Sequence, residues 1–203
     1  MRYSKDHKDE TRAQILSAAA RLFRTEGIAS VSVADVMADV GLTHGGFYRY
    51  FPSKEALVKE SVASAVAATS DYLASQKQVG VGGLEGLLRA YLRDARRDSP
   101  HNGCVFSILT AEMARRPADS KESFLEGLDV FVELIFEELP ATVPKAERWR
   151  RATVIFGLMV GVMQIARLMG DEPASDAILD EGVRSALQLA AGGPETKPTS
   201  RRK

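Results

Sequence analysis

The sequence predicts an all-α protein of about nine helices, with a small N-terminal domain and a larger C-terminal one. Apolar residues recur at helical spacing in almost every segment between the turns, and no segment alternates polar and apolar residues as a half-buried strand does. The 203 residues, of which 45% are hydrophobic, suffice for one small and one larger domain with buried cores.

The first expected helix, residues 9–26, has one apolar face and ends at Gly27, a residue suited to the left-handed position after a helix. The face is formed by Ile15, Ala18, Ala19, Leu22 and Phe23.

Two short helices joined by a glycine turn are expected next. Ser32 stands ahead of the first, where its hydroxyl can cap free N–H groups, and Gly41 follows it. Thr43 is expected to cap the second, whose Phe47 and Phe51 point inward. The apolar face of the first helix is formed by Val33, Val36, Met37 and Val40. A pair of helices with an exposed second helix is typical of helix-turn-helix proteins, which insert that helix into the DNA major groove.

Six longer helices are expected after this unit. Their expected ranges are 54–78, 84–97, 104–115, 120–139, 145–169 and 175–191. Residues 192–203 are polar and basic, which is typical of a disordered tail. The predicted domains are therefore residues 1–53, a helix-turn-helix domain, and residues 54–191, with the tail after them.

Bulk charge gives no sign of a nucleic-acid partner. Lys plus Arg and Asp plus Glu both number 27, and residues 1–60 hold nine basic against eight acidic residues. Non-specific DNA binding scales with the phosphates neutralised, so this balance disfavours an architectural DNA binder. The first ten residues have no apolar core of a signal peptide, and the apolar stretch 152–163 is too short to span a membrane. A cytoplasmic protein without a membrane segment is expected.

Residues 11–60 resemble the N-terminal domain of the TetR family of bacterial transcriptional regulators. The matching stretches are TRAQILSAAARLFRTEGIASVSV, VADVMADVGLTHGGFYRYF and PSKEALVKE. The chain departs from the common pattern at Met37, where many relatives carry alanine, and at Arg49 and Tyr50, which replace a frequent Tyr-His pair. The resemblance implies a dimeric DNA-binding regulator whose C-terminal helices form a ligand pocket and a dimer interface.

Phosphate contacts are expected from hydroxyl and ammonium groups near the two short helices, because such contacts position a protein on DNA. The expected residues are Ser32, Thr43, Tyr48, Tyr50 and Lys54. The roles of Tyr48, Tyr50 and Lys54 are implied by the family pattern.

Base contacts are expected where the recognition helix opens, at Thr43, His44 and Gly45. Arg49 is the candidate for a bidentate contact to guanine. Structural roles without DNA contact stay open for these residues. His44 could be a solvated surface histidine, Gly45 could belong to a short helix held by packing, and Tyr48 and Tyr50 could be half-buried aromatic residues.

Lys5, Lys8 and Arg12 are candidates for contacts with flanking phosphates. For the two lysines, the alternative is an unstructured arm exposed to solvent.

In the C-terminal domain, Gly157 and Gly161 stand one turn apart and let another helix approach closely. We predict that the last two helices pair with their copies in a homodimer; packing within one chain is the alternative. A small-molecule effector is expected in this domain, and each apolar candidate for its pocket could equally be plain core. The candidates are Phe106, Met113, Phe124, Phe131, Met159, Met163, Gln164 and Arg167.

Cys104 is the single cysteine, so no intramolecular disulfide forms. It is expected at a helix N-terminus, which lowers a thiol pKa and would suit an electrophile sensor. Burial as a small hydrophobic residue is the alternative.

The resulting hypothesis is a repressor that binds a pseudo-palindromic double-stranded DNA operator and is released by a small molecule. The sequence holds three histidines and no nucleophile–base motif, so no enzyme, cofactor or metal is expected. An α-helical enzyme or carrier is the rival hypothesis.

Overall fold

The computed structural model describes residues 5–76, 82–93, 104–170 and 173–192, and these contain helices and no strand. The elements are α1 (Lys5–Glu26), α2 (Val33–Asp39), the 3-10 helix η1 (His44–Arg49), α3 (Lys54–Gln76), α4 (Gly83–Arg93), α5 (Val105–Met113), α6 (Ala118–Glu138), α7 (Lys145–Met169) and α8 (Pro173–Ala191). The predicted all-α class is confirmed. The first helix begins before residue 9, and the predicted end of α4 at residue 97 lies outside the described residues.

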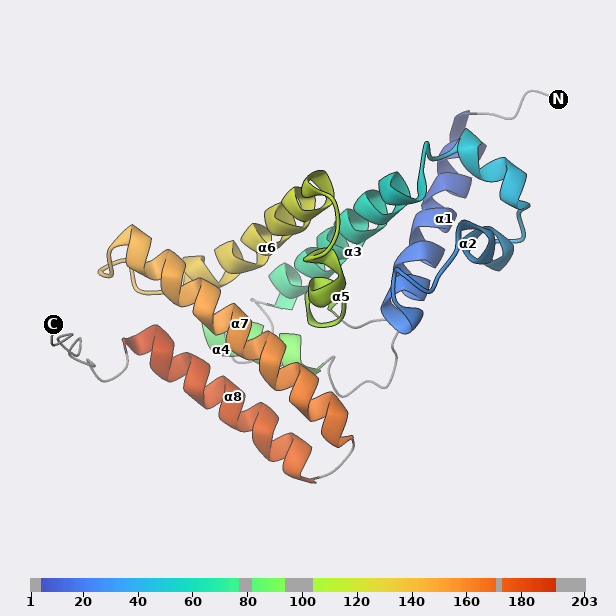
Figure 1. Cartoon of the computed structure of the whole chain (residues 1–203). Helices are drawn as coiled ribbons and strands as arrows, with labels where there is room; N and C mark the ends of the chain where they lie inside the picture. The colour runs from blue at the N-terminus through green and yellow to red at the C-terminus, as the bar shows by residue number, and fades with distance from the viewer. Residues whose placement is uncertain (1–4, 77–81, 94–103, 171–172, 193–203) are drawn as a thin grey trace, which may run out of the picture.

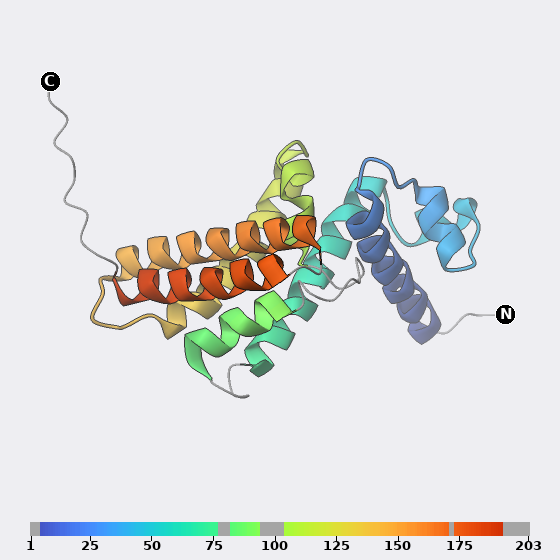
Figure 2. The same ribbon diagram turned by 90° about the horizontal axis from the view of Figure 1, so that it is seen from below.

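The helices form two groups joined by α3. Figure 1 shows α1, α2 and the short cyan helix after α2 at one end of the molecule, and α7 with α8 at the other. Helix α3 packs against α1 in the first group and against α6 in the second. Figure 2 shows α7 and α8 lying side by side. Helix α3 is therefore shared by the two groups.

Local sequence explains the two tight turns of the N-terminal group. Gly27 has φ +84° and Gly41 has φ +70°, a region of backbone conformation that other residues rarely adopt. Ser32 then begins α2 with a reciprocal cap: Asp35 N–H donates to Ser32 Oγ (3.2 Å), and Ser32 N–H donates to Asp35 Oδ2 (2.8 Å). The predicted cap at Ser32 is confirmed.

Helix α7 corrects one expectation about membranes. The whole of Lys145–Met169 is long and apolar enough to cross a membrane by length and composition, although the apolar stretch 152–163 alone is not. Such a helix also occurs in the core of soluble proteins. Here α7 packs against α6 and α8 and buries Ile155, Phe156 and Met159 among them.

Candidate nucleic-acid interface and ligand cavity

The second short element is a single 3-10 helix of six residues rather than an α-helix. Thr43 stands at its N-cap position, but the Thr43 side chain makes no capping hydrogen bond, so that part of the prediction is wrong. Tertiary packing holds the element instead: Phe47 is fully buried, and its ring stacks on that of Phe51 with centroids 5.8 Å apart. The Thr43 hydroxyl therefore lies exposed and uncommitted to the helix.

The outer face of η1 presents four of the predicted residues. The side chains of His44 and Arg49 are exposed, and Tyr48 is 66% exposed although it is a large aromatic residue. The rings of His44 and Tyr48 meet edge to face at 6.4 Å. A Cβ atom added to Gly45 would meet no atom within 4 Å, so internal packing does not require glycine there. The missing side chain leaves backbone open to an approaching partner.

Two residues that were predicted to contact phosphate make contacts within the protein. Tyr50 is half-buried and packs on the core, which is the alternative role considered for it in the sequence. The Lys54 ammonium donates a hydrogen bond to the carbonyl oxygen of Ile28 (2.7 Å). Burial lowers the pKa of Lys54, and the charge of Arg116 adds to this, while Glu112 acts in the opposite direction. Contacts of Tyr50 and Lys54 with phosphate stay predictions.

The basic residues predicted to contact flanking phosphates differ in their surroundings. Arg12 forms an ion pair with Glu60, and its guanidinium lies 4.8 Å from the centre of the Phe51 ring. Lys8 is exposed, and the Lys5 side chain lies outside the described side chains. Arg12 therefore stabilises the contact between α1 and α3, a role that sequence spacing did not reveal.

A connection between the two groups of helices was not predicted. The α5 residue Glu112 accepts a hydrogen bond from the N–H of Ala29 (3.0 Å), in the loop that leads into α2. Its other carboxylate oxygen lies 2.7 Å from the place of a Cβ atom on Gly27, so a side chain at residue 27 would displace the Glu112 carboxylate. A second link joins α3 to the start of α6, where Glu55 accepts from Arg116 (3.2 Å) and from Ser120 (2.5 Å).

An apolar cavity of about 310 Å³ lies between α5, α6 and α7 and is open to solvent. Three of the predicted ligand-binding residues line it: Phe106, Met113 and Phe124. The remaining lining residues are Thr110, Ala114, Lys121, Leu125, Leu128, Phe156, Gly157 and Val160. A second hollow, of about 360 Å³, lies between α1 and α3 and is lined largely by alanine, serine and threonine side chains.

The other predicted ligand residues do not line this cavity. Phe131 and Met159 border a space of only about 20 Å³, and Met163 is buried in the core. Gln164 is exposed. Arg167 donates a hydrogen bond to Ser107 Oγ (2.9 Å) and so joins α7 to α5. Helical spacing predicted that the apolar residues point inward, and Gln164 and Arg167 were chosen as polar residues of an apolar helix. Which side chains border a cavity depends on how the helices pack, and the spacing does not show this.

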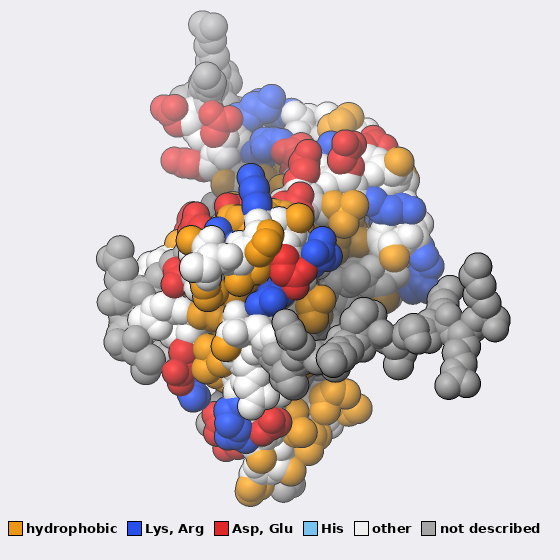
Figure 3. All heavy atoms as spheres, turned by 90° about the vertical axis from the view of Figure 1, so that its left-hand side faces the viewer, with side chains coloured by type: hydrophobic (Ala, Val, Ile, Leu, Met, Phe, Trp, Pro, Cys, Tyr) orange, Lys and Arg blue, Asp and Glu red, His pale blue; other side chains and the backbone are white. Residues whose placement is uncertain are grey.

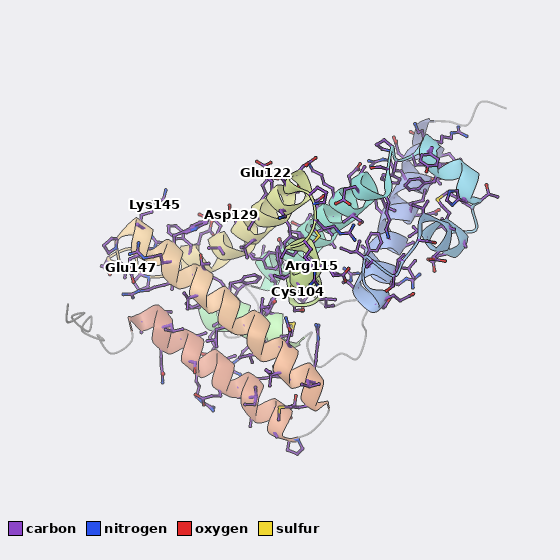
Figure 4. The ribbon with its side chains drawn as sticks, in the orientation of Figure 1. Cys104, Arg115, Glu122, Asp129, Lys145 and Glu147 are labelled. Atoms are coloured by element: carbon purple, nitrogen blue, oxygen red, sulfur yellow. The ribbon has the colours of Figure 1, made fainter. Side chains whose placement is uncertain are left out.

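Cys104 stands at the N-cap of α5, as predicted, and its side chain is buried. Burial raises the pKa of the thiol, and this outweighs the opposing effects of the Tyr91 hydroxyl, the Ser107 and Phe106 N–H groups and Arg167. The expected lowering of the thiol pKa is therefore wrong. Figure 4 shows Cys104 at the base of α5, away from the charged side chains labelled along α6.

An apolar stripe remains exposed along α7. Gly157 and Gly161 are both exposed, and a Cβ atom on either would meet nothing within 4 Å. Val154, Ile165 and Leu168 continue the stripe, and Leu168 is 85% exposed. Figure 3 shows hydrophobic side chains gathering at the lower end of one face, where α7 ends and α8 begins. Packing within the chain thus does not cover the two glycines.

Comparison with known proteins agrees with this architecture. Residues 15–61 match the model of bacterial regulatory proteins, tetR family. The HTH-type transcriptional regulator TtgR of Pseudomonas putida is 38% identical over 74 residues, which cover 36% of this chain and 35% of TtgR. The HTH-type transcriptional repressor NemR of Escherichia coli is 23% identical over 126 residues, 62% of this chain and 63% of NemR.

Solved structures share the fold over most of the chain. A TetR transcriptional regulator from Chloroflexus aurantiacus superposes with a TM-score of 0.77 at 22% identity, covering 93% of this chain and 98% of the other. Reduced E. coli NemR gives a TM-score of 0.71 at 20% identity, covering 87% and 95%. Residues 15–61 are therefore similar in sequence to bacterial regulatory proteins of the tetR family, and the chain shares its fold with solved TetR regulators. It spans about a third of TtgR in the sequence match.

Proposed function

We propose that this protein is a transcriptional repressor that binds a pseudo-palindromic DNA operator as a homodimer and is released by a small molecule. The observation that carries the proposal is the exposed face of η1, where His44, Gly45, Tyr48 and Arg49 lie together on a buried Phe47. A face of this kind meets base edges in the major groove, while hydroxyl and N–H groups hold phosphates. The relatives' names, which describe transcriptional regulators and repressors, support the same function.

The exposed stripe on α7 supports the homodimer. Two copies related by a two-fold axis present the same surface to each other, so small residues at Gly157 and Gly161 would let two α7 helices approach closely. Apolar side chains at Ile165 and Leu168 would then leave solvent. A dimer places two η1 elements on successive major grooves of one DNA face, about one helical turn apart or a little more.

Helix α5 supplies a route from ligand to DNA. One side of α5 forms the wall of the cavity through Phe106 and Met113, and Glu112, next to Met113, holds the loop ahead of α2 through Ala29. A ligand that moves α5 therefore changes the support of the helix-turn-helix unit. Release from DNA is a population shift, limited by the ligand's difference in affinity for the two states.

DNA binding is tested with the fragment upstream of the protein's own gene, against a scrambled duplex at about 150 mM salt. We expect a preference of roughly a thousandfold or more for the operator. In Arg49→Ala this preference should fall by the equivalent of about 1–3 kcal/mol, the value of one bidentate base contact. Arg115→Ala, which removes another exposed arginine after the end of α5, should leave it unchanged. Equal binding to both duplexes, and to a genomic fragment library, would falsify the proposal.

The route through α5 is tested by Glu112→Ala, which removes the acceptor of the Ala29 N–H group. We expect operator binding without effector to persist and the effect of an effector on DNA affinity to shrink. Glu133→Ala, on the exposed side of α6, is the matched control because no described hydrogen bond or ion pair involves it. A full effector response in Glu112→Ala would show that the signal takes another path.

A further inference from the structure

The cavity between α5, α6 and α7 has walls that offer a ligand almost no polar partner. Its one hydroxyl, on Thr110, donates to the Phe106 carbonyl oxygen one turn earlier in the same helix. Its one charged residue, Lys121, is exposed at the rim, so its methylene groups contribute to the wall while the ammonium stays in water. The rest of the lining is carbon from Phe, Met, Leu, Val, Ala and Gly side chains and backbone.

These walls discriminate against charge. A buried polar group without a hydrogen-bonding partner is costly, and a buried charge without one costs far more. Three acidic residues of α6, Glu122, Glu126 and Asp129, lie exposed beside the rim residues in the sequence and do not line the cavity. Charges of both signs therefore stand in water near the mouth, where they are screened, and none offers a partner inside the walls. An uncharged molecule avoids the cost of burying a charge there.

The rings in the wall favour an aromatic occupant. Phe106 packs against Phe124 with ring centroids 4.5 Å apart and against Phe156 with centroids 5.6 Å apart, and all three line the cavity. Tilted and edge-to-face ring contacts of this kind extend readily to a further ring.

Volume sets the size of the occupant. An apolar cavity of about 150 Å³ holds benzene, which has six heavy atoms. The cavity here, about 310 Å³, is roughly twice as large and so matches about a dozen heavy atoms. That is the size of a two-ring aromatic compound.

We propose that the effector of this protein is an uncharged aromatic compound of about two rings, bound between α5, α6 and α7. Calling this compound an effector rests on the proposed regulatory function, but its binding to the protein is measured without DNA. Failure of the ligand class and failure of operator binding are therefore separate results.

Three probes with one ring system test the charge preference: 2-naphthalenemethanol, 2-naphthoate and 2-naphthylmethylammonium. Isothermal titration calorimetry on the full chain should show the alcohol binding roughly tenfold or more tighter than either ion. Lys121→Met keeps the apolar stem and should leave the affinity for the alcohol unchanged. The proposal is overturned by no binding of the alcohol, or by tighter binding of the naphthoate that Lys121→Met abolishes.

A matched pair of variants tests the location. Ala114→Leu and Ala111→Leu enlarge two exposed alanines three residues apart at the end of α5, but only Ala114 lines the cavity. Ala114→Leu should weaken binding of 2-naphthalenemethanol roughly tenfold or more, because the leucine side chain fills part of the volume. Ala111→Leu should bind as the unchanged protein does. Equal binding by both variants would place the probe elsewhere, with the hollow between α1 and α3 as the next site to examine.

Discussion

The two ends of the molecule differ in what lies behind their exposed faces. Around η1, Phe23, Phe47 and Phe51 are buried, and none of them lines the hollow between α1 and α3. In the C-terminal group, an apolar cavity lies between α5, α6 and α7, and an apolar stripe of α7 is exposed. In the proposed repressor, the buried rings would fix the shape of the surface that meets DNA, while the cavity and the stripe would leave room for a ligand and a second copy.

The largest effect is expected among the buried rings around η1. Phe47→Ala removes a fully buried ring that stacks on Phe51, so we expect the free energy of unfolding to fall by about 3–5 kcal/mol. Tyr48→Ala removes the neighbouring ring, which is 66% exposed, and should change stability by no more than about 0.5 kcal/mol while weakening operator binding. Urea unfolding and operator titration measure the two effects. Similar losses of stability in both variants would contradict the view that Phe47 belongs to the core and Tyr48 does not.

The apolar stripe of α7 is expected to give the next largest effect. Leu168→Glu places a charge on a residue that is 85% exposed in one chain, so the single chain should fold normally. In the proposed dimer that charge is buried, and the dimer dissociation constant should rise on the order of a hundredfold or more. Sedimentation equilibrium measures it. Val130→Glu alters an exposed apolar residue of α6 outside the stripe and serves as the control. A dimer that withstands Leu168→Glu would remove α7 from the interface.

The same contrast explains which features the sequence could predict. The elements of the N-terminal group follow from local chemistry: a capping serine, two glycine turns and two phenylalanines four residues apart. Helical spacing likewise gave the extents of α5 to α8 to within a few residues. It could not separate Phe106 and Phe124, which line the cavity, from Phe131, which does not, because all three are inward positions. Nor could it pair Glu112 with Ala29, 83 residues apart, since only the packed fold brings them together.

A smaller effect at Cys104 distinguishes an electrophile that reacts with the thiol from a ligand that binds in the cavity. Because burial raises the pKa of its thiol, little thiolate is present at neutral pH, and we expect alkylation by iodoacetamide to be roughly tenfold or more slower than that of glutathione. The rate should increase with pH beyond the range in which an ordinary thiol has ionised. Mass spectrometry after timed quenching measures it, with urea-unfolded protein as the fully reactive control. A rate in the folded protein equal to that of glutathione would favour electrophile sensing at Cys104 over the cavity.

The smallest effect concerns the cap that aims the helix-turn-helix unit. Ser32→Ala removes the hydroxyl that accepts from Asp35 N–H, and at neutral pH it should cost about 1 kcal/mol of stability. Hydrogen bonds from Ser32 lower the pKa of the Asp35 carboxyl in the folded state. A carboxyl with a depressed folded-state pKa stabilises the protein above its unfolded pKa, and this contribution is lost as the pH falls through the folded value.

The difference between the original protein and Ser32→Ala should therefore shrink under acid conditions, below the ordinary aspartate range. Ser53→Ala is the control, because Ser53 Oγ accepts a hydrogen bond from Ala56 N–H (3.1 Å), three residues later, as Ser32 Oγ does from Asp35 N–H. Ala56 has no carboxylate that could accept a hydrogen bond from the Ser53 N–H group. The cost of Ser53→Ala should be similar at neutral pH and independent of pH, as measured by urea unfolding across an acid series. Equal pH dependence in both variants would show that the serine hydroxyl alone, and not its reciprocal pairing with Asp35, holds the start of α2.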